Sequence, residues 1–250
     1  MMQWHGFACE AVTFEGFSGF VVFPAAGTAN GLLAVKTEYW GAFPHALEVP
    51  LLQAGFHLCF LQNRCRWGAD DDLDRKARFV RCIQDRYGLH RRCVPVGMSC
   101  GGLMAVKFAA RYPELVSSLY LDAPVMNYYS CPCGFGDGDP LDGGRGIREM
   151  LDALGLTGTD ALDDYYDMPM HCIPALVRSG IPVAMVAGDS DRVVPYHENG
   201  ALLQEAFERA GLPLLLRIKP GCGHHPHGWT DPQEIVHFLL HYAGCDFTKG

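Results

Sequence analysis

Short apolar segments alternate with amphipathic segments along most of this 250-residue chain. His57–Gln62 is an apolar run of the length that suits a strand buried on both faces. Further along, apolar residues from Leu73 to Tyr87 recur at spacings of three and four, which predicts one face of an amphipathic helix. Repeated alternation of this kind predicts a mainly parallel sheet with helices on both faces.

The rest of the chain follows the same pattern, with one interruption. Strands are predicted at 13–14, 19–24, 32–39, 57–62, 93–98, 118–121, 182–187 and 214–219. Helices are predicted at 73–87, 102–111, 147–154, 201–210 and 232–243. Between Leu121 and Ile181 the alternation breaks down, and Gly, Asp, Tyr and Pro become frequent. We therefore predict one domain over residues 1–250, in which residues 124–180 form a lid-like insertion after the sixth strand.

Composition and charge narrow the class of protein. Hydrophobic residues make up 49% of the chain and charged residues 19%, which supplies a large core and excludes intrinsic disorder. The net charge of −8 argues against a nucleic-acid partner, because phosphate binding needs clustered Lys and Arg. No apolar run reaches the roughly 18–20 residues of a membrane span, and residues 1–10 show no signal peptide. We therefore expect a cytoplasmic protein with no membrane partner.

The segment Gly97–Gly101 (GMSCG) carries the strongest chemical signal in the chain. It lies between a predicted buried strand and a predicted apolar helix, which is the setting that a G-x-S-x-G nucleophile elbow requires. A solvated serine in a glycine-rich turn is the alternative, but few chance matches lie between a strand and a helix. Ser99 is therefore the candidate nucleophile.

A serine nucleophile needs a base, and the base needs an acid that orients it. After such an elbow, the acid and then the histidine follow on loops after later strands. The strand at 182–187 is followed by Gly-Asp-Ser-Asp, and the strand at 214–219 by a loop with two adjacent histidines. From the residues alone, Asp189 and Asp191 are candidates for the acid, and His224 and His225 for the base.

Cysteine and histidine also suggest other chemistry. The eleven cysteines are an odd number, and the lack of an export signal favours free, mostly buried thiols. Cys131 and Cys133 are one residue apart, which fits neither a common zinc knuckle nor a thioredoxin-like pair. A metal site of Cys222, His227 and the two adjacent histidines would lie in one short loop, with no further ligand at a recognisable spacing. We therefore predict no metal and no cofactor.

Three motifs together resemble those of the α/β-hydrolase superfamily. They are the elbow, GDSDRVVP at Gly188–Pro195 and PGCGHHPHG at Pro220–Gly228. More narrowly, they resemble the prolyl-oligopeptidase-like esterases that accompany polysaccharide-degrading enzymes in bacteria. The resemblance implies the α/β-hydrolase fold, with Asp191 as the acid and His224 as the base. The chain departs from the pattern at Cys100, where these esterases tend to carry Arg or another polar residue.

The same edge of the sheet supplies candidates for the oxyanion hole and for substrate binding. The backbone N–H of Cys100 follows the nucleophile and is predicted as one oxyanion donor. Position alone indicates Tyr39, in the loop after the third strand, as the second. Substrate-binding candidates follow the fourth strand and the histidine loop, and they are Arg64, Arg66, Trp67 and Trp229. For the two tryptophans, packing in the wall or under the final helix is the alternative.

These features predict a serine ester hydrolase that acts through an acyl-enzyme. The expected partner is a small-molecule ester, such as an acylated sugar or plant oligosaccharide, on the basis of fold analogy. Two alternatives stay open. One is a serine peptidase of the same fold, and the other is a non-enzymatic domain whose Cys and His bind metal or sense redox state. The sequence determines neither the acyl and alcohol groups of the substrate nor the oligomeric state.

Overall fold

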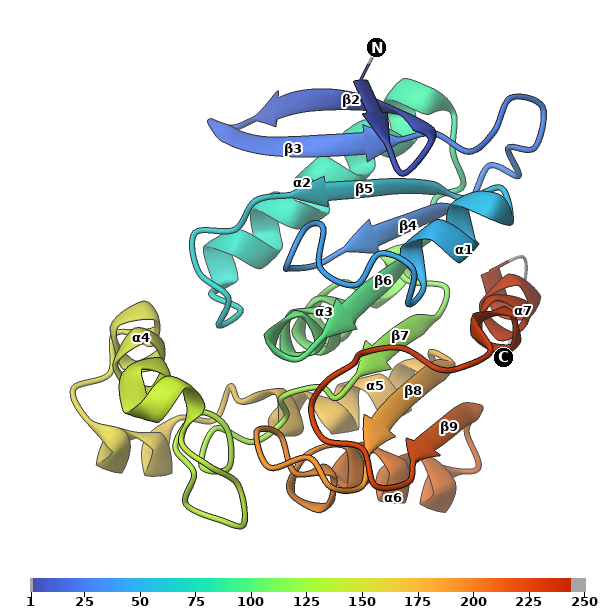
Figure 1. Ribbon diagram of the computed structural model, residues 1–250. Coiled ribbons are helices and arrows are strands. Elements are labelled where there is room, and N and C mark those ends of the chain that lie inside the picture. The colour runs from blue at the N-terminus through green and yellow to red at the C-terminus, as the bar shows by residue number, and fades with distance from the viewer. Residues whose placement is uncertain (1, 244–250) are drawn as a thin grey trace.

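The computed structural model describes residues 2–243 and contains a nine-stranded sheet (Figure 1). Across the sheet the strand order is β1-β2-β3-β5-β4-β6-β7-β8-β9. The strands β1 to β3 pair antiparallel with one another, and β3 also pairs antiparallel with β5. All pairs from β5 to β9 are parallel. The strands are β1 Met2–Trp4, β2 Phe7–Phe14, β3 Phe17–Val22, β4 Leu33–Lys36, β5 His57–Leu61, β6 Cys93–Met98, β7 Leu119–Asp122, β8 Val183–Gly188 and β9 Leu214–Lys219.

Helices connect the parallel strands and cover both faces of the sheet (Figure 1). The α-helices are α1 Glu48–Gln53, α2 Asp70–Tyr87, α3 Cys100–Arg111, α4 Arg145–Leu154, α5 Ile173–Ser179, α6 Gly200–Ala210 and α7 Pro232–Ala243. Short 3₁₀ helices are η1 Pro113–Leu115, η2 Leu141–Gly144, η3 Thr159–Asp164, η4 Pro169–Cys172 and η5 Tyr196–Glu198. The mainly parallel sheet with helices on both faces confirms the predicted fold class.

Two apolar clusters, one on each face of the sheet, form the core. Leu33 and Val35 of β4 contribute to the cluster under α2, α3, α5 and α6, whereas Ala34 contributes to the cluster under α1 and α7. Successive residues of a strand point to opposite faces, so a strand buried on both faces must be apolar at every position. This is why β5, with every residue buried, was visible as a continuous apolar run.

Three short elements, β1, α1 and α5, were absent from the predicted set. β1 has three residues and is mostly exposed, so it carries no apolar alternation that a pattern could detect. α1 has six residues, includes Pro50 and is buried except for its last residue, so it shows no amphipathic period. α5 has seven residues and lies in the segment where the alternation breaks down, so it too gives no clear period. The remaining strands and helices lie where the sequence predicted them, although β2 begins six residues before its predicted start and other ends differ by a few residues. Gly244, which was expected just beyond the last helix, lies outside the described residues.

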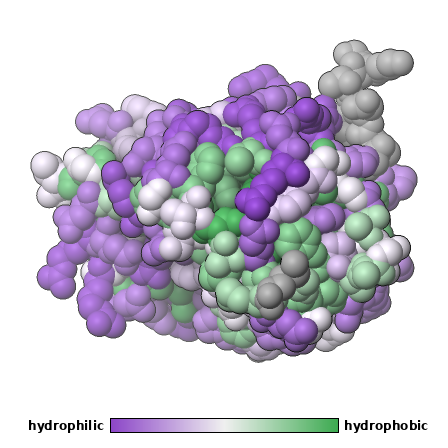
Figure 2. Space-filling view, turned by 90° about the horizontal axis from the view of Figure 1, so that it is seen from above, coloured by the Kyte–Doolittle hydropathy of each residue, from purple (hydrophilic) through white to green (hydrophobic). Residues whose placement is uncertain are grey.

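The face above the antiparallel strands is mainly polar. In Figure 2 hydrophilic side chains cover the left and upper parts of this view, and a group of hydrophobic ones extends from the middle to the lower right. On the sheet, the rings of Phe20 and Trp40 stack at 5.1 Å and those of Trp40 and Trp4 at 4.8 Å, which joins β1 and β3 to the loop after β4.

Between residues 2 and 243, no helix has both the length and the apolar character needed to cross a membrane.

Residues 124–180 separate β7 from β8 and contain α4, α5 and three short 3₁₀ helices. The start of this segment is fixed by Asn199, whose buried side chain accepts the backbone N–H groups of Met126 and Asn127 at 2.9 and 3.1 Å. At its other end α5 packs beside α3 (Figure 1). α4 lies apart from the sheet, beyond the carboxyl ends of the parallel strands.

Candidate active site

The turn between β6 and α3 holds Ser99 in an unusual backbone conformation. Ser99 has φ 53° and ψ −123°, a region that non-glycine residues rarely adopt and that proteins retain mainly at functional sites. The turn is so tight that a Cβ on Gly97 would lie 2.3 Å from the carbonyl oxygen of Gly101. Glycine is therefore required at position 97, and the serine side chain projects from the strand end as a nucleophile elbow demands.

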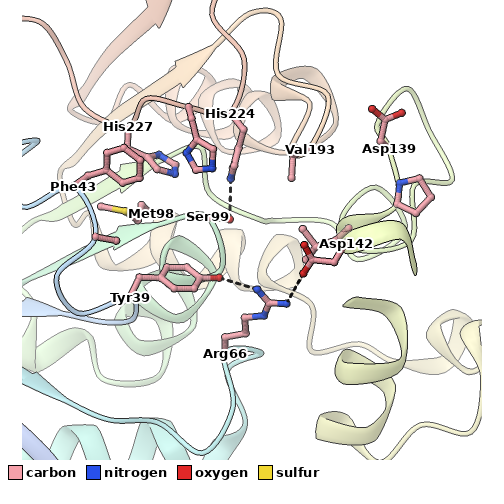
Figure 3. Close-up of a pocket in the computed structure, with 14 residues that line it drawn as sticks. Tyr39, Phe43, Arg66, Met98, Ser99, Asp139, Asp142, Val193, His224 and His227 are labelled. Atoms are coloured by element: carbon pink, nitrogen blue, oxygen red, sulfur yellow. Dashed lines mark hydrogen bonds and ion pairs between the residues drawn. The ribbon is translucent and has the colours of Figure 1, made fainter. Parts of the chain in front are cut away.

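Ser99, Asp191 and His224 meet at the carboxyl edge of the sheet. His224 Nε2 lies 3.1 Å from Ser99 Oγ (Figure 3). His224 Nδ1 lies 2.7 Å from Asp191 Oδ2. When Nδ1–H donates to the carboxylate, Nε2 is free to accept the serine proton. The three side chains therefore form a hydrogen-bonded serine, histidine and aspartate series.

Asp191 has the surroundings of a permanently charged acid, and its rival Asp189 does not contact the histidine. The second oxygen of Asp191 accepts the backbone N–H groups of Val193 and Val194, both at 2.8 Å. Burial alone would raise the pKa of Asp191, but the bond and charge of His224, with these N–H groups, lower it below its usual range. Asp189 is exposed and accepts the N–H of Gly221 at 2.7 Å, which closes a turn.

The acid and histidine loops are held against each other by backbone contacts. A Cβ on Gly188 would lie 2.2 Å from the carbonyl oxygen of Cys222, so this approach requires glycine at the end of β8. The N–H of Ser190 donates to the same carbonyl at 3.0 Å. This close approach places Asp191 within reach of His224.

A second histidine and carboxylate pair lies beside the first. His227 Nδ1 is 2.9 Å from Asp122 Oδ1, and both residues are buried. The other oxygen of Asp122 accepts the N–H of Gly228 at 2.5 Å and the hydroxyl of Tyr120 at 3.1 Å. Burial alone would raise the pKa of Asp122, but the bond and charge of His227, Lys219 and the Gly228 N–H lower it. The sequence indicates His227 as a candidate metal ligand, but no sequence signal pairs it with Asp122.

A cavity of about 370 Å³ opens in front of Ser99 and His224. Its apolar walls come from Tyr39, Phe43, Met98 and Val193 (Figure 3). Residues 139–142, from the predicted insertion, close the far end. Its volume lies within the range of roughly 300–1,000 Å³ that small-molecule binding sites have, so a small substrate can bind next to the serine hydroxyl.

Comparisons with known proteins agree with this architecture. Residues 71–133, which include the elbow, match the family described as alpha/beta hydrolase fold. An acylaminoacyl peptidase in complex with Z-Gly-Gly-Phe-chloromethyl ketone is 13% identical with a TM-score of 0.73, over 98% of this chain and 43% of that one. Pyrococcus horikoshii acylaminoacyl peptidase is 13% identical with a TM-score of 0.68, over 87% and 37%. Porphyromonas gingivalis dipeptidyl peptidase 4 is 14% identical with a TM-score of 0.66, over 95% and 35%.

This chain has the α/β-hydrolase fold. It spans 43%, 37% and 35% of the length of these three solved structures. The expected resemblance to the superfamily is confirmed at the level of the fold. The likeness to carbohydrate esterases has no counterpart in these comparisons.

Within this α/β-hydrolase fold, the two predicted oxyanion donors differ in whether the backbone N–H already has a hydrogen-bond acceptor. Cys100 is the first residue of α3, and among the described residues its backbone N–H has no hydrogen-bond acceptor. The N–H of Tyr39 already donates to the carboxylate of Glu38 at 3.1 Å. The side chain of Tyr39, in contrast, lines the cavity. Tyr39 therefore belongs to the site through its ring and hydroxyl, which corrects the expected role of its backbone.

Three of the predicted substrate-binding residues lie outside the cavity in front of Ser99 and His224. Arg64 is exposed and forms an ion pair with Asp71 at 2.9 Å. Trp67 is fully buried in the core, where its ring packs edge-on against Tyr128. Trp229 is half-buried and packs against the apolar cluster under α7, because its loop turns back towards that helix. The structure thus places none of these three residues in the cavity, and both tryptophans pack as their alternative describes.

Arg66 is the one residue of that candidate group that lines the cavity. It contacts the Tyr39 hydroxyl at 3.5 Å and Asp142 at 3.4 Å (Figure 3), and it binds Glu149 of α4 through two hydrogen bonds of 3.0 and 2.6 Å. Arg66 therefore ties the predicted insertion to the loop after β5. Because two carboxylates surround it, Arg66 gives the cavity little net positive charge.

The cysteines of the described residues are free. Burial raises the pKa of the Cys100 thiol to about 11 and that of Cys133 to about 11, and it also raises the pKa of Cys131. Thiols of this kind stay protonated near neutral pH and are poor nucleophiles.

In the described part of the chain, two groups of side chains have a geometry that can hold a metal ion. They are His224, His225 and His227, and Asp137, His197 and Glu198.

Proposed function

We propose that this chain is a serine hydrolase that acts through an acyl-enzyme, with Ser99 as nucleophile, His224 as general base and Asp191 as the orienting acid. The observation that carries the proposal is the unbroken hydrogen-bond series from Ser99 Oγ through His224 to Asp191. A solvated serine in a glycine-rich turn would need neither the φ of 53° nor a histidine held by a buried carboxylate.

In the first half of the proposed reaction, Ser99 Oγ attacks the substrate carbonyl while His224 Nε2 takes the serine proton. The C–O or C–N bond of the tetrahedral intermediate then breaks, and His224 gives that proton to the leaving alcohol or amine. Water next attacks the acyl-enzyme, and His224 takes a proton from the water and returns it to Ser99. The negative charge of Asp191 stabilises the imidazolium in both halves.

The oxyanion in this scheme receives one hydrogen bond from the N–H of Cys100 and a second from the hydroxyl of Tyr39. The Tyr39 hydroxyl is favoured over the Tyr39 N–H, because the N–H already has Glu38 as its acceptor and the ring lines the cavity. Burial raises the pKa of Tyr39, so its hydroxyl keeps the proton that it donates. Donors fixed in place before the reaction stabilise developing charge most effectively.

For the leaving group, we propose an amine of a short peptide in preference to the alcohol of the small ester that the sequence predicted. The support is that the solved structures of similar fold are named as peptidases. These names favour the peptidase alternative over the ester hydrolase.

A substrate panel tests both the serine hydrolase mechanism and the proposed preference for a peptide substrate. Peptide p-nitroanilides, p-nitrophenyl acyl esters, acetylated sugars and feruloyl esters are compared by kcat/KM, with Ser99→Ala as the matched control. We expect cleavage of activated esters, because any acyl-enzyme mechanism hydrolyses them, and of at least one peptide anilide. Hydrolysis of acetylated sugars or feruloyl esters, with no hydrolysis of any peptide anilide, would favour the ester hydrolase over the peptidase. Absence of all turnover, with no labelling of Ser99 by a fluorophosphonate, would reject the serine hydrolase itself.

A further inference from the structure

Three histidines lie together at one end of the catalytic cavity. In each pair formed by His224, His225 and His227 the ring centroids are 5.0 Å apart. One ring nitrogen from each residue lies within 4.8 Å of the other two. The proposed reaction uses only His224, so it gives no reason for two further imidazoles at this place.

Two of these histidines are already oriented in the way that metal ligands usually are. A ligating imidazole commonly donates its other ring N–H to a carboxylate, which fixes its tautomer and its orientation. His224 Nδ1 is bonded to Asp191 and His227 Nδ1 to Asp122, and both carboxylates are buried. Each ring is thus left with Nε2 as the nitrogen that can take an ion.

His225 supplies the third nitrogen. It is exposed at the rim of the cavity, where its ring stacks on Phe43 at 5.4 Å. Ligands of a tetrahedral zinc ion lie roughly 3.4 Å from one another, since each zinc–nitrogen bond is about 2.0–2.1 Å. Rotation of the exposed His225 ring can shorten its distances to the other two nitrogens, and a small shift of the loop that carries all three residues must close the remaining gap between His224 and His227. The fourth position then opens into the cavity that these residues line.

We propose that His224, His225 and His227 form a binding site for a divalent transition-metal ion, Zn²⁺ in particular, and that the bound ion inhibits the enzyme reversibly. The ion takes the lone pair of His224 Nε2, so Ser99 loses the acceptor for its proton and keeps that proton. No covalent bond is made or broken, and a chelator therefore restores the base. The inhibitory effect rests on the proposed function, whereas binding of the ion does not.

The other histidine group with suitable geometry is a weaker candidate. His197 Nε2 is bonded to Asp137 at 2.9 Å, and Glu198 accepts the N–H of Asp137 at 2.6 Å and binds the Ser130 hydroxyl. All three members are hydrogen-bonded to one another or to Ser130, and the bonded nitrogen of His197 is the one that faces this group. His197→Ala is therefore the matched control for the proposed site.

Binding is measured first, without reference to activity. The full chain is stripped with a chelator and titrated with ZnCl₂ by calorimetry, beside His225→Ala, His227→Ala and His197→Ala. We expect one ion per chain, an affinity lowered about tenfold or more in the first two variants, and no change in the third. Co²⁺ in place of Zn²⁺ should give the visible absorption of a nitrogen-ligated tetrahedral ion without a thiolate charge-transfer band, which separates the histidines from Cys222.

Inhibition is measured as the rate at which a fluorophosphonate labels Ser99, relative to the rate of each protein without metal. We expect Zn²⁺ to slow labelling of the parent chain, EDTA to restore it, and His225→Ala to need about tenfold more Zn²⁺. His225 is exposed, so this variant should fold even if the loss of buried His227 disturbs the loop. Zinc binding that is unchanged in His225→Ala, lost in His197→Ala or accompanied by a thiolate band would overturn the site.

The remaining outcomes separate the two proposals. If Zn²⁺ binds at the histidines and labelling proceeds at its full rate, the inhibitory role is wrong. If Ser99 is not labelled even without metal, the serine hydrolase proposal fails, and calorimetry with the three variants alone decides the metal site.

Discussion

Two histidine and carboxylate pairs, Asp191–His224 and Asp122–His227, border the same cavity, and one of them reaches a serine. In each pair the histidine bonds through Nδ1, at 2.7 Å to Asp191 and at 2.9 Å to Asp122. Both carboxylates are buried, and both have pKa values below the usual range. The chemistry of the pairs is therefore nearly the same, and their positions must distinguish their roles.

Position relative to the nucleophile elbow makes that distinction. His224 Nε2 is 3.1 Å from Ser99 Oγ, whereas Asp122 uses its remaining acceptor capacity on the N–H of Gly228 and the hydroxyl of Tyr120. The first pair is thus placed for proton transfer, and the second fixes the histidine loop to the end of β7. A histidine bonded to a buried carboxylate is not by itself a catalytic signature. The predictions below test this division of roles.

The largest expected effect is the loss of the nucleophile. Ser99→Ala should lower kcat by about 10⁴-fold or more, because a triad without its nucleophile keeps only binding and oxyanion stabilisation. Turnover of an activated p-nitrophenyl ester by parent and variant measures the loss. Labelling by a fluorophosphonate should disappear in parallel. Near-parental turnover in Ser99→Ala would show that neither pair serves this serine.

The next effect separates the two aspartates of one loop. Asp191→Asn should lower kcat by about 10⁴-fold, since the imidazole loses the partner that holds its tautomer and stabilises its charge. Asp189→Asn is the matched control and should change kcat by less than about tenfold, because this side chain only closes a turn. Steady-state kinetics on the same ester measures both. Reversed effects would assign the acid to Asp189.

A smaller effect is expected from the proposed second oxyanion donor. Tyr39→Phe keeps the ring and removes the hydroxyl, and it should lower kcat about 10²–10³-fold with little change in KM. This split is expected because the hydrogen bond forms to the charge of the transition state and not to the substrate carbonyl. An increase in KM at constant kcat would show instead that Tyr39 only shapes the cavity.

The sequence predicted the fold class because the pattern of buried strands is repeated many times. A run such as His57–Leu61 is buried at every position. Because several such runs predict the same kind of sheet, one ambiguous segment does not change the predicted fold class. β1 and α1 were missed because three and six residues are too few to establish a period. Motifs at strand ends predict Ser99 and two candidates each for the acid and the base, and the family resemblance favours Asp191 and His224. The structure brings these three residues together.

Side-chain direction in loops was harder to predict. Arg64, Arg66 and Trp67 are close in sequence, yet one is exposed, one lines the cavity and one is buried in the core. A strand reveals direction through its alternation, but the loop after β5 has no such period. The pairing of Asp122 with His227 was missed for a related reason, because it joins residues far apart in the chain whose only common signal is a place at a strand end.

The smallest expected effect on turnover, with a clear effect on stability, is that of Asp122→Asn. His227 does not contact Ser99, so kcat should fall less than about tenfold, while loss of charged hydrogen bonds should lower the free energy of unfolding by about 1–3 kcal/mol at pH 7. Because the pKa of Asp122 is lowered in the folded chain, its charge contributes stability above its unfolded pKa of about 3.9. That contribution is lost as the pH falls below this value towards the folded pKa. Urea unfolding of parent and variant, repeated from pH 7 downwards, measures the free energy of unfolding at each pH. The values for the two proteins should therefore converge below about pH 4. A difference that stays constant with pH, or a loss of kcat as large as in Asp191→Asn, would contradict the separation of the two pairs.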